Sequence, residues 1–348
     1  MTQAWSAWLA AQGLSPDAAS FGDLVQEAKA ADAEHVIAPL LDHGLIRASG
    51  ADAAEFLHNL LTNDIKGIGP TDLRLAGLCT AKGRLLALFH IWRDGDDFLL
   101  MLPKDILPPI LKKLTMYVLR ARVSLRDASD EITLLGYAAA PDAAPLSALG
   151  VDAAGIPARK SIALKGGRAM RLDARRWMLA LAPDDAAARW QSLAADGARP
   201  VGLATWQRLE ILAGQARVLA ATQEAFVPQM LNLELPSIAA VSFTKGCYPG
   251  QEIVARTQYL GKVKRRTYRA RVAVAVPPGS HVFAPATGDQ HCGTIVSIAA
   301  APDGAYECLV CVQSGARDAG EVRVGTPDGA LLEFLPLPYS VEDPAGGG

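Results

Sequence analysis

The segment Lys245–Glu252 places an ammonium, a thiol, a phenol, an amide and a carboxylate around two glycines. Buried core segments rarely look like this, because each such group costs free energy to bury without a partner. Tyr248-Pro249-Gly250-Gln251 predicts a type II turn, since proline presets φ at the second position and glycine accepts a positive φ at the third. Apolar residues then recur at helical spacing, so we expect a helix to begin at Gln251.

Cys247 is the residue of this segment best placed to do chemistry. The free N–H groups and positive dipole end of the predicted helix would lie close to it, and Lys245 is two residues away. Both effects favour a thiolate. We therefore interpret Cys247 as a functional thiol assisted by Lys245. The alternative is that Cys247 is a small inert residue beside a structural turn, as many free cysteines are.

Composition excludes several classes of protein. The chain has 348 residues, of which 50% are hydrophobic and 20% charged, so we expect a globular protein of two or three domains. The formal net charge of -2 argues against direct nucleic-acid binding. No apolar run approaches the roughly 18–20 residues of a membrane span. Residues 1–11 contain no lysine or arginine, and the five cysteines make no disulfide framework, so we predict a cytoplasmic protein.

Strand and turn patterns predict an α+β fold with a C-terminal antiparallel barrel. Leu85–Trp92 and Phe98–Leu102 read as strands joined by the hairpin signal Asp94-Gly95. After residue 265, alternating strands are separated by the turns Pro277-Pro278-Gly279, Pro302-Asp303-Gly304 and Pro327-Asp328-Gly329. We predict an N-terminal tail or helix (1–34), a first α+β domain (35–135), a second α+β domain carrying the Lys245–Glu252 segment (136–264), a barrel (265–338) and a disordered tail (339–348).

Cys308 and Cys311 have the spacing of metal ligands, yet they fall in a predicted strand, Tyr306–Gln313. Residues i and i+3 of a strand point to opposite faces, so the two thiols cannot converge on one ion. This favours barrel core over a metal or cluster site, and we predict no resident metal.

A basic stretch follows the predicted turn. No acidic residue occurs between Ile253 and Gly288, whereas seven cations do: Arg256, Lys262, Lys264, Arg265, Arg266, Arg269 and Arg271. One interpretation is an anion site for a polycarboxylate tail or a nucleic-acid backbone. The other is a solvated barrel rim.

Glu210 and Trp206 lie on a predicted helix, Thr205–Ala213, with Gly214 at its C-terminal cap. By itself a carboxylate on a helix is more often solvated than functional. The sequence contains none of the hydrolase, zinc-protease or P-loop motifs and no convincing dinucleotide fingerprint.

The octapeptide resembles the K-G-C-[FY]-x-G-Q-E signature of the YgfZ family, a branch of the folate-binding superfamily typified by the glycine-cleavage T-protein. Further segments carry the same resemblance over residues 38–338. Phe56–Ile65 looks like the family's first helix with its Asn63-Asp64 tip, Thr80–Arg84 resembles its T-x-K-G-R turn, and Phe226–Glu234 resembles the segment that leads to the signature.

The resemblance implies three domains arranged as a ring around a tetrahydrofolate pocket. It also implies an accessory role in iron–sulfur cluster assembly or repair, supporting radical enzymes such as the tRNA thiomethylation enzyme. The implied partners are iron–sulfur enzymes or cluster carriers, together with folate polyglutamate.

The resemblance also suggests which residues contact the folate. Glu210 is similar in position to the T-protein's pterin-binding glutamate, and Glu252 is a second candidate. Trp206 or Tyr248 could stack on the pterin, and the stretch that begins at Arg256 could receive the glutamate tail. The remaining candidates for folate contact are Gln251, Asn63, Asp64 and Arg84.

The sequence also departs from the T-protein. Pro103-Lys104 stands where the T-protein carries an Asn-Ala pair, and no residue matches its catalytic aspartate. Whether the chain is an enzyme therefore stays open. The alternative to an accessory protein is a tetrahydrofolate-dependent aminomethyl or methyl transferase, which turnover with an amine donor would reveal.

Overall fold

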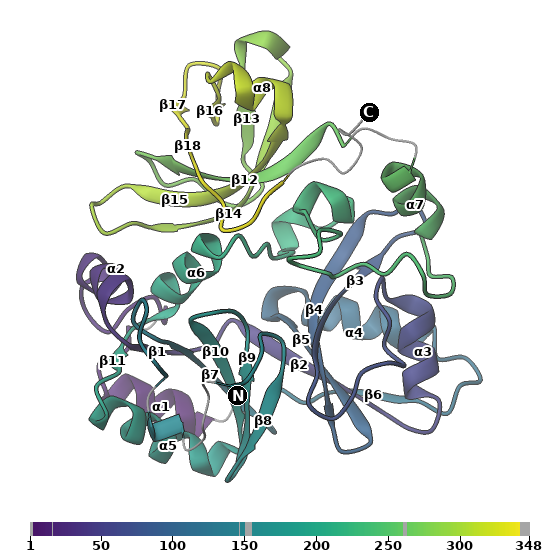
Figure 1. Cartoon of the computed structure of the whole chain (residues 1–348), viewed down its shortest axis with the longest axis vertical. Helices are drawn as coiled ribbons and strands as arrows, with labels where there is room; N and C mark the ends of the chain where they lie inside the picture. Colours follow the sequence, from purple (N-terminus) through teal and green to yellow (C-terminus); the bar gives the residue numbers. More distant parts are fainter. Residues whose placement is uncertain (1–2, 16, 146, 150–154, 260–262, 342–348) are drawn as a thin grey trace.

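Three β-sheets lie around a common centre in the computed structural model (Figure 1). The structure describes residues 3–15, 17–145, 147–149, 155–259 and 263–341. Two sheets are flanked by helices, and the third forms an antiparallel barrel. The predicted α+β fold with a C-terminal barrel is therefore confirmed.

The first sheet is made of strands that are largely buried. Its order is β3-β4-β5-β2-β6, and all neighbours are antiparallel. On β4, Phe89 and Ile91 pack beneath α3 and α4, whereas Leu88 and His90 line a cavity on the opposite face, as the two-residue period of a strand requires. The elements are β2 (His43–Ser49), α3 (Ala53–Leu60), β3 (Leu73–Cys79), β4 (Leu85–Asp94), β5 (Asp97–Pro103), a short 3-10 helix (Lys104–Ile106), α4 (Leu107–Met116) and β6 (Ser124–Asp127).

The second sheet has the order β11-β1-β7-β10-β9-β8, and the pair β1 and β11 is its parallel one. Helices α1 and α5 pack together through aromatic rings, with the Trp5 and Trp190 centroids 6.0 Å apart. The elements are α1 (Gln3–Ala11), α2 (Leu24–Ala33), β1 (Val36–Pro39), β7 (Thr133–Ala138), a 3-10 helix (Ser147–Leu149), β8 (Ser161–Leu164), β9 (Gly167–Arg171), β10 (Arg176–Leu181), α5 (Pro183–Ala195) and β11 (Arg199–Pro200).

The barrel is a seven-stranded antiparallel sheet of order β17-β16-β13-β14-β15-β12-β18. Its turns fall at the three Pro/Gly signals of the sequence. The elements are β12 (Arg265–Val272), β13 (His281–Phe283), a 3-10 helix (Pro285–Thr287), β14 (His291–Ala300), β15 (Tyr306–Gln313), α8 (Ser314–Ala319), β16 (Arg323–Val324), β17 (Ala330–Leu331) and β18 (Glu333–Leu335).

Helix α6 (Leu203–Leu212) lies where the three sheets meet. Trp206 and Leu209 pack into a core shared by the first two sheets, and Ile211 packs into a core shared by the first sheet and the barrel. The helix ends at Leu212, and Gly214, two residues later, has the positive φ of +64° that is expected of a glycine closing a helix. The chain then runs through 3-10 helices at Ala220–Thr222 and Pro228–Leu231 to α7 (Gln251–Tyr259).

The chain segments do not sort into sheets strictly by sequence order. β1 falls inside the range predicted for the first domain, yet it pairs with β7 and β11 of the second sheet. The predicted domain limits stay predictions. Among the described residues, no helix is long and apolar enough to cross a membrane.

Candidate functional site

The Lys245–Glu252 segment forms the turn that its sequence predicts. The Gln251 backbone N–H donates to the Tyr248 carbonyl at 3.1 Å, Gly250 has φ +81°, and α7 begins at Gln251. A Cβ at Gly250 would lie 2.4 Å from the Thr80 carbonyl oxygen and 2.7 Å from the Gly83 Cα. The turn therefore interlocks with the Thr80–Arg84 turn through two glycines, at a separation that no side chain would permit.

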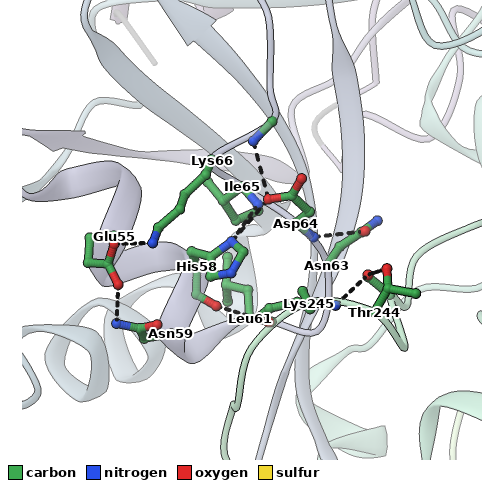
Figure 2. Close-up of polar contacts among 12 residues, drawn as sticks. Glu55, His58, Asn59, Leu61, Asn63, Asp64, Ile65, Lys66, Thr244 and Lys245 are labelled. Atoms are coloured by element: carbon green, nitrogen blue, oxygen red, sulfur yellow. Dashed lines mark hydrogen bonds and ion pairs between the residues drawn. The ribbon is translucent and has the colours of Figure 1, made fainter.

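Lys245 binds the end of helix α3. Its Nζ donates to the Leu61 carbonyl at 2.6 Å and also to the His58 carbonyl (Figure 2). The same Nζ lies 4.9 Å from the centroid of the Tyr248 ring. An ammonium suits the negative end of a helix dipole, where carbonyls lack intrahelical partners. Burial lowers the pKa of Lys245 to about 8. Lys245 thus anchors the Lys245–Glu252 segment, which we call the signature turn, to the first sheet.

The Asn63-Asp64 tip lies in the same neighbourhood (Figure 2). The Asn63 amide donates to the carbonyls of Leu75 and Ala239, each at 2.8 Å, so its side chain joins β3 to the segment before the turn. Asp64 Oδ1 lies 3.0 Å from His58 Nδ1. Burial and the nearby Lys245 lower the pKa of His58. His58 was missed as a site residue, although it stands in the predicted first helix.

Cys247 is exposed, whereas the other four cysteines are buried. Burial raises the pKa of Cys79, Cys308 and Cys311 to about 12. Cys308 packs inside the barrel and Cys311 packs on its outer side, against the core shared with the first sheet, which confirms that the two thiols face opposite ways. No group of three metal-ligating side chains occurs in the described ranges.

The other residues predicted near the turn have local roles. Tyr248 is buried, and burial raises the pKa of its phenol. Gln251 Oε1 accepts from the Tyr248 N–H at 3.3 Å, and Arg84 donates to the Ala225 carbonyl at 2.7 Å. Glu252 and Arg256 are both exposed on α7. The structure therefore brings Lys245, Tyr248 and Gln251 together with the Asn63-Asp64 tip, around a turn that presents Cys247 to solvent.

The expectation that the basic stretch presents its cations together is wrong for two of them. Arg266 is buried and forms an ion pair with Glu234, and Arg271 forms one with Asp303. Both carboxylates come from distant parts of the chain. A stretch of sequence without acidic residues can therefore have acidic residues beside it in the folded protein. Lys262 lies outside the described residues.

A cavity of about 460 Å³ opens at the centre of the molecule, between the first sheet, the second sheet and α6. We call it the central cavity. Its apolar wall is formed mainly by Leu73, Leu75, Leu88, Leu209, Leu233 and Ile238. Its charged groups are Arg159, Arg175, Arg176 and Asp173, three arginines against one aspartate. The cavity thus combines apolar walls with an excess of positive charge.

One face of the central cavity carries a connected polar chain. Arg176 Nε donates to Asp173 Oδ2 at 2.7 Å, and Arg176 Nη2 donates to Gln215 Oε1 at 2.7 Å. The Gln215 amide nitrogen lies 3.1 Å from His90 Nε2. Burial lowers the pKa of His90 to about 3, so the imidazole is neutral. These four residues come from three segments, since Asp173 and Arg176 are only three positions apart, and none was predicted from the sequence.

Glu210 and Trp206 do not line the central cavity, as far as the described residues go. Trp206 is 1% exposed and packs in the core. Glu210 lines a second cavity of about 270 Å³, between α6, the Pro103–Asp105 corner and the barrel. There its Oε2 lies 3.5 Å from Arg217 Nη1, and Arg217 also pairs with Asp42 at 2.7 Å. The structure therefore separates Glu210 from both the signature turn and the central cavity.

Comparison with known proteins yields close sequence relatives and a more distant structural one. The tRNA-modifying protein YgfZ of Edwardsiella ictaluri is 31% identical over 321 residues, which cover 89% of this chain and 95% of that protein. That of Vibrio vulnificus (strain YJ016) is 29% identical over 310 residues, covering 87% and 92%. No family model matches the chain.

Among solved structures, the glycine cleavage system aminomethyltransferase T from Bartonella henselae superposes with a TM-score of 0.70 at 16% identity. The superposition covers 91% of this chain and 88% of that one. At this identity the likeness shows a shared fold.

Proposed function

Because this chain belongs to the YgfZ family of tRNA-modifying proteins, we propose that it is a folate-binding accessory protein for iron–sulfur enzymes, such as the one that thiomethylates tRNA. In this proposal reduced folate occupies the central cavity, and Cys247 makes a transient contact with the iron–sulfur client at the outer turn. The T-protein-like fold and the rigid layout of the signature turn support the proposal.

The central cavity is the observation that carries folate binding. Its volume of about 460 Å³ lies in the range typical of small-molecule sites, and its leucine-rich walls suit a flat pterin ring. Folate also carries a glutamate tail with two carboxylates. Three arginines against one aspartate give the lining two excess positive charges, which favours such an anion.

The signature turn supports the second half of the proposal. Cys247 is exposed, and its turn is held rigidly by the interlocked glycines and by Lys245. A cysteine thiolate is an ordinary ligand of cluster iron. Lys245 donates its N–H groups to backbone carbonyls, so we assign it a positioning role for the turn that presents the thiol.

The experiment for folate binding is anaerobic calorimetry of the purified protein with tetrahydrofolate and its polyglutamates. We expect binding that tightens with tail length and weakens with added salt, because the arginines of the cavity attract the carboxylates. Failure of every folate to bind would contradict this half of the proposal. Turnover with an amine donor would favour the transferase alternative instead.

The experiment for Cys247 is complementation of a deletion strain, read out as tRNA thiomethylation. Cys247→Ala should abolish complementation while leaving folate affinity unchanged, and Cys308→Ala is the matched control, since that thiol is buried in the barrel. In native protein, iodoacetamide should modify Cys247 and spare the four buried thiols. Full complementation by Cys247→Ala would show that the signature is structural.

A further inference from the structure

The polar face of the central cavity contains one buried donor that has no acceptor. Arg176 is 4% exposed and lines the cavity. Its Nε and Nη2 are bound to Asp173 and Gln215, whereas Nη1 has no partner among the described residues. An unpaired buried N–H of a guanidinium is costly, and a ligand acceptor that reached Nη1 from the cavity would remove that cost.

The direction of every hydrogen bond on this face is fixed. Arginine can only donate, so Gln215 must present its oxygen to Arg176 and its amide N–H groups to His90. His90 Nε2 therefore accepts. Asp173 is also fully engaged, because Oδ1 accepts from the backbone N–H groups of Arg175 and Arg176 at 2.9 and 2.8 Å. The face thus offers the ligand a donor, while its carboxylate is already bound.

The charge on this face favours a neutral acceptor. The Arg176 guanidinium is already balanced by Asp173 at 2.7 Å. Although burial alone would raise the pKa of Asp173, Arg176 and the backbone N–H groups hold it below its usual value, so the carboxyl is ionised. A second carboxylate at Nη1 would give the buried Arg176 guanidinium two carboxylates to balance, counting the half-buried Asp173, and so a net negative charge, whereas a carbonyl oxygen would not.

We propose that Arg176 Nη1 donates a hydrogen bond to the 4-oxo oxygen of the pterin, with Gln215 holding the guanidinium in place. The inference rests on the proposed binding of folate in the central cavity. It makes Arg176 the residue that distinguishes a 4-oxo pterin from a 4-amino pterin, since an amino group would place a donor against a donor.

The test compares tetrahydrofolate with tetrahydroaminopterin, its 4-amino analogue, by anaerobic calorimetry. The wild-type protein should bind the 4-oxo compound about 10–100-fold more tightly, the range expected when a buried donor loses its acceptor. Arg176→Gln should reduce that ratio to about 3 or less. Gln215→Leu should also lower it, because the arginine remains but loses its orienting contact.

Arg175→Gln is the matched control. Arg175 lines the same cavity, but its Nε and Nη2 donate to the backbone carbonyls of Ala139 and Ala31. This variant removes the same charge and should keep the discrimination ratio. The ratio compares two ligands on one sample, so partial misfolding of a variant does not change it.

A tail-free probe, 6-methyltetrahydropterin, distinguishes the pterin oxygen from a tail carboxylate. Arg176→Gln should weaken its binding as much as that of tetrahydrofolate. If only tetrahydrofolate is affected, the acceptor is a tail carboxylate and the inference is wrong. Equal wild-type affinity for the 4-oxo and 4-amino compounds, or an unchanged ratio in Arg176→Gln, would overturn this inference alone. Absence of all folate binding would overturn the proposed function as well.

Discussion

The signature turn and the central cavity are built in opposite ways. The turn is a dense run of polar residues that exposes one thiol and is fixed by close backbone packing at Gly83 and Gly250. The cavity is a largely apolar space whose few polar groups come from stretches that are far apart in the sequence. The comparison teaches that a conspicuous sequence motif can mark a rigid surface turn. A pocket that suits a ligand can be formed by residues that make no recognisable motif in the sequence.

Gly250→Ala should break the signature turn and leave the cavity intact. The new Cβ would lie 2.4 Å from the Thr80 carbonyl at a φ of +81°, so we expect a loss of about 3 kcal/mol in the free energy of unfolding. Urea denaturation measures it. Gly246→Ala is the control, since a Cβ at that position would meet no heavy atom of the described residues within 4 Å. Equal stability of the two variants would refute the interlocked turns.

Lys245→Met should lower the free energy of unfolding less than Gly250→Ala does, by about 1–2 kcal/mol at neutral pH. The reason is that two carbonyls at the end of α3 lose their donor. The folded pKa of Lys245 is about 8, below its ordinary value of 10.5. The unfolded chain therefore holds more protons between pH 8 and 10.5, and wild-type stability should rise with pH there relative to the variant. Urea denaturation of both proteins across this range tests the sign, and a flat difference would contradict it.

Glu210→Gln should have the smallest effect on folate. Glu210 lines the second cavity, so tetrahydrofolate affinity should change by less than about twofold, or about 0.4 kcal/mol. Arg176→Gln should cost at least about tenfold in the same calorimetric assay. A tenfold loss in Glu210→Gln would instead place the pterin in the second cavity and support the role that the sequence suggests for this glutamate.

Local signals in the sequence were sufficient for several features. Pro249 and Gly250 encode the turn, and α7 begins at Gln251. Gly214 follows the end of α6. The alternation of side chains along β15 places Cys308 and Cys311 on opposite faces. Each depends on residues only a few positions apart, so propensity and period determine the outcome.

Long-range pairing could not be predicted in the same way. Arg266 meets Glu234, 32 residues earlier, and Gln215 meets His90, 125 residues earlier. β1 pairs with β7 of the second sheet, although all strands of the first sheet lie between β1 and β7 in the sequence. From the sequence alone Arg176 would be predicted to lie on the surface. In the structure it is buried and bonded to Asp173 and Gln215. The polar face of the central cavity is formed by tertiary packing. The periodicity of a single sequence does not predict which distant residues will meet in this way.

Hydrogen exchange with and without tetrahydrofolate tests the central claim most directly, because it locates the ligand without any mutation. We predict slower exchange in peptides covering 172–176, 214–216 and 237–238, which line the central cavity, and unchanged exchange in the peptide covering 245–259. Protection confined to 245–259, with the three cavity peptides unaffected, would contradict the assignment of folate to the central cavity.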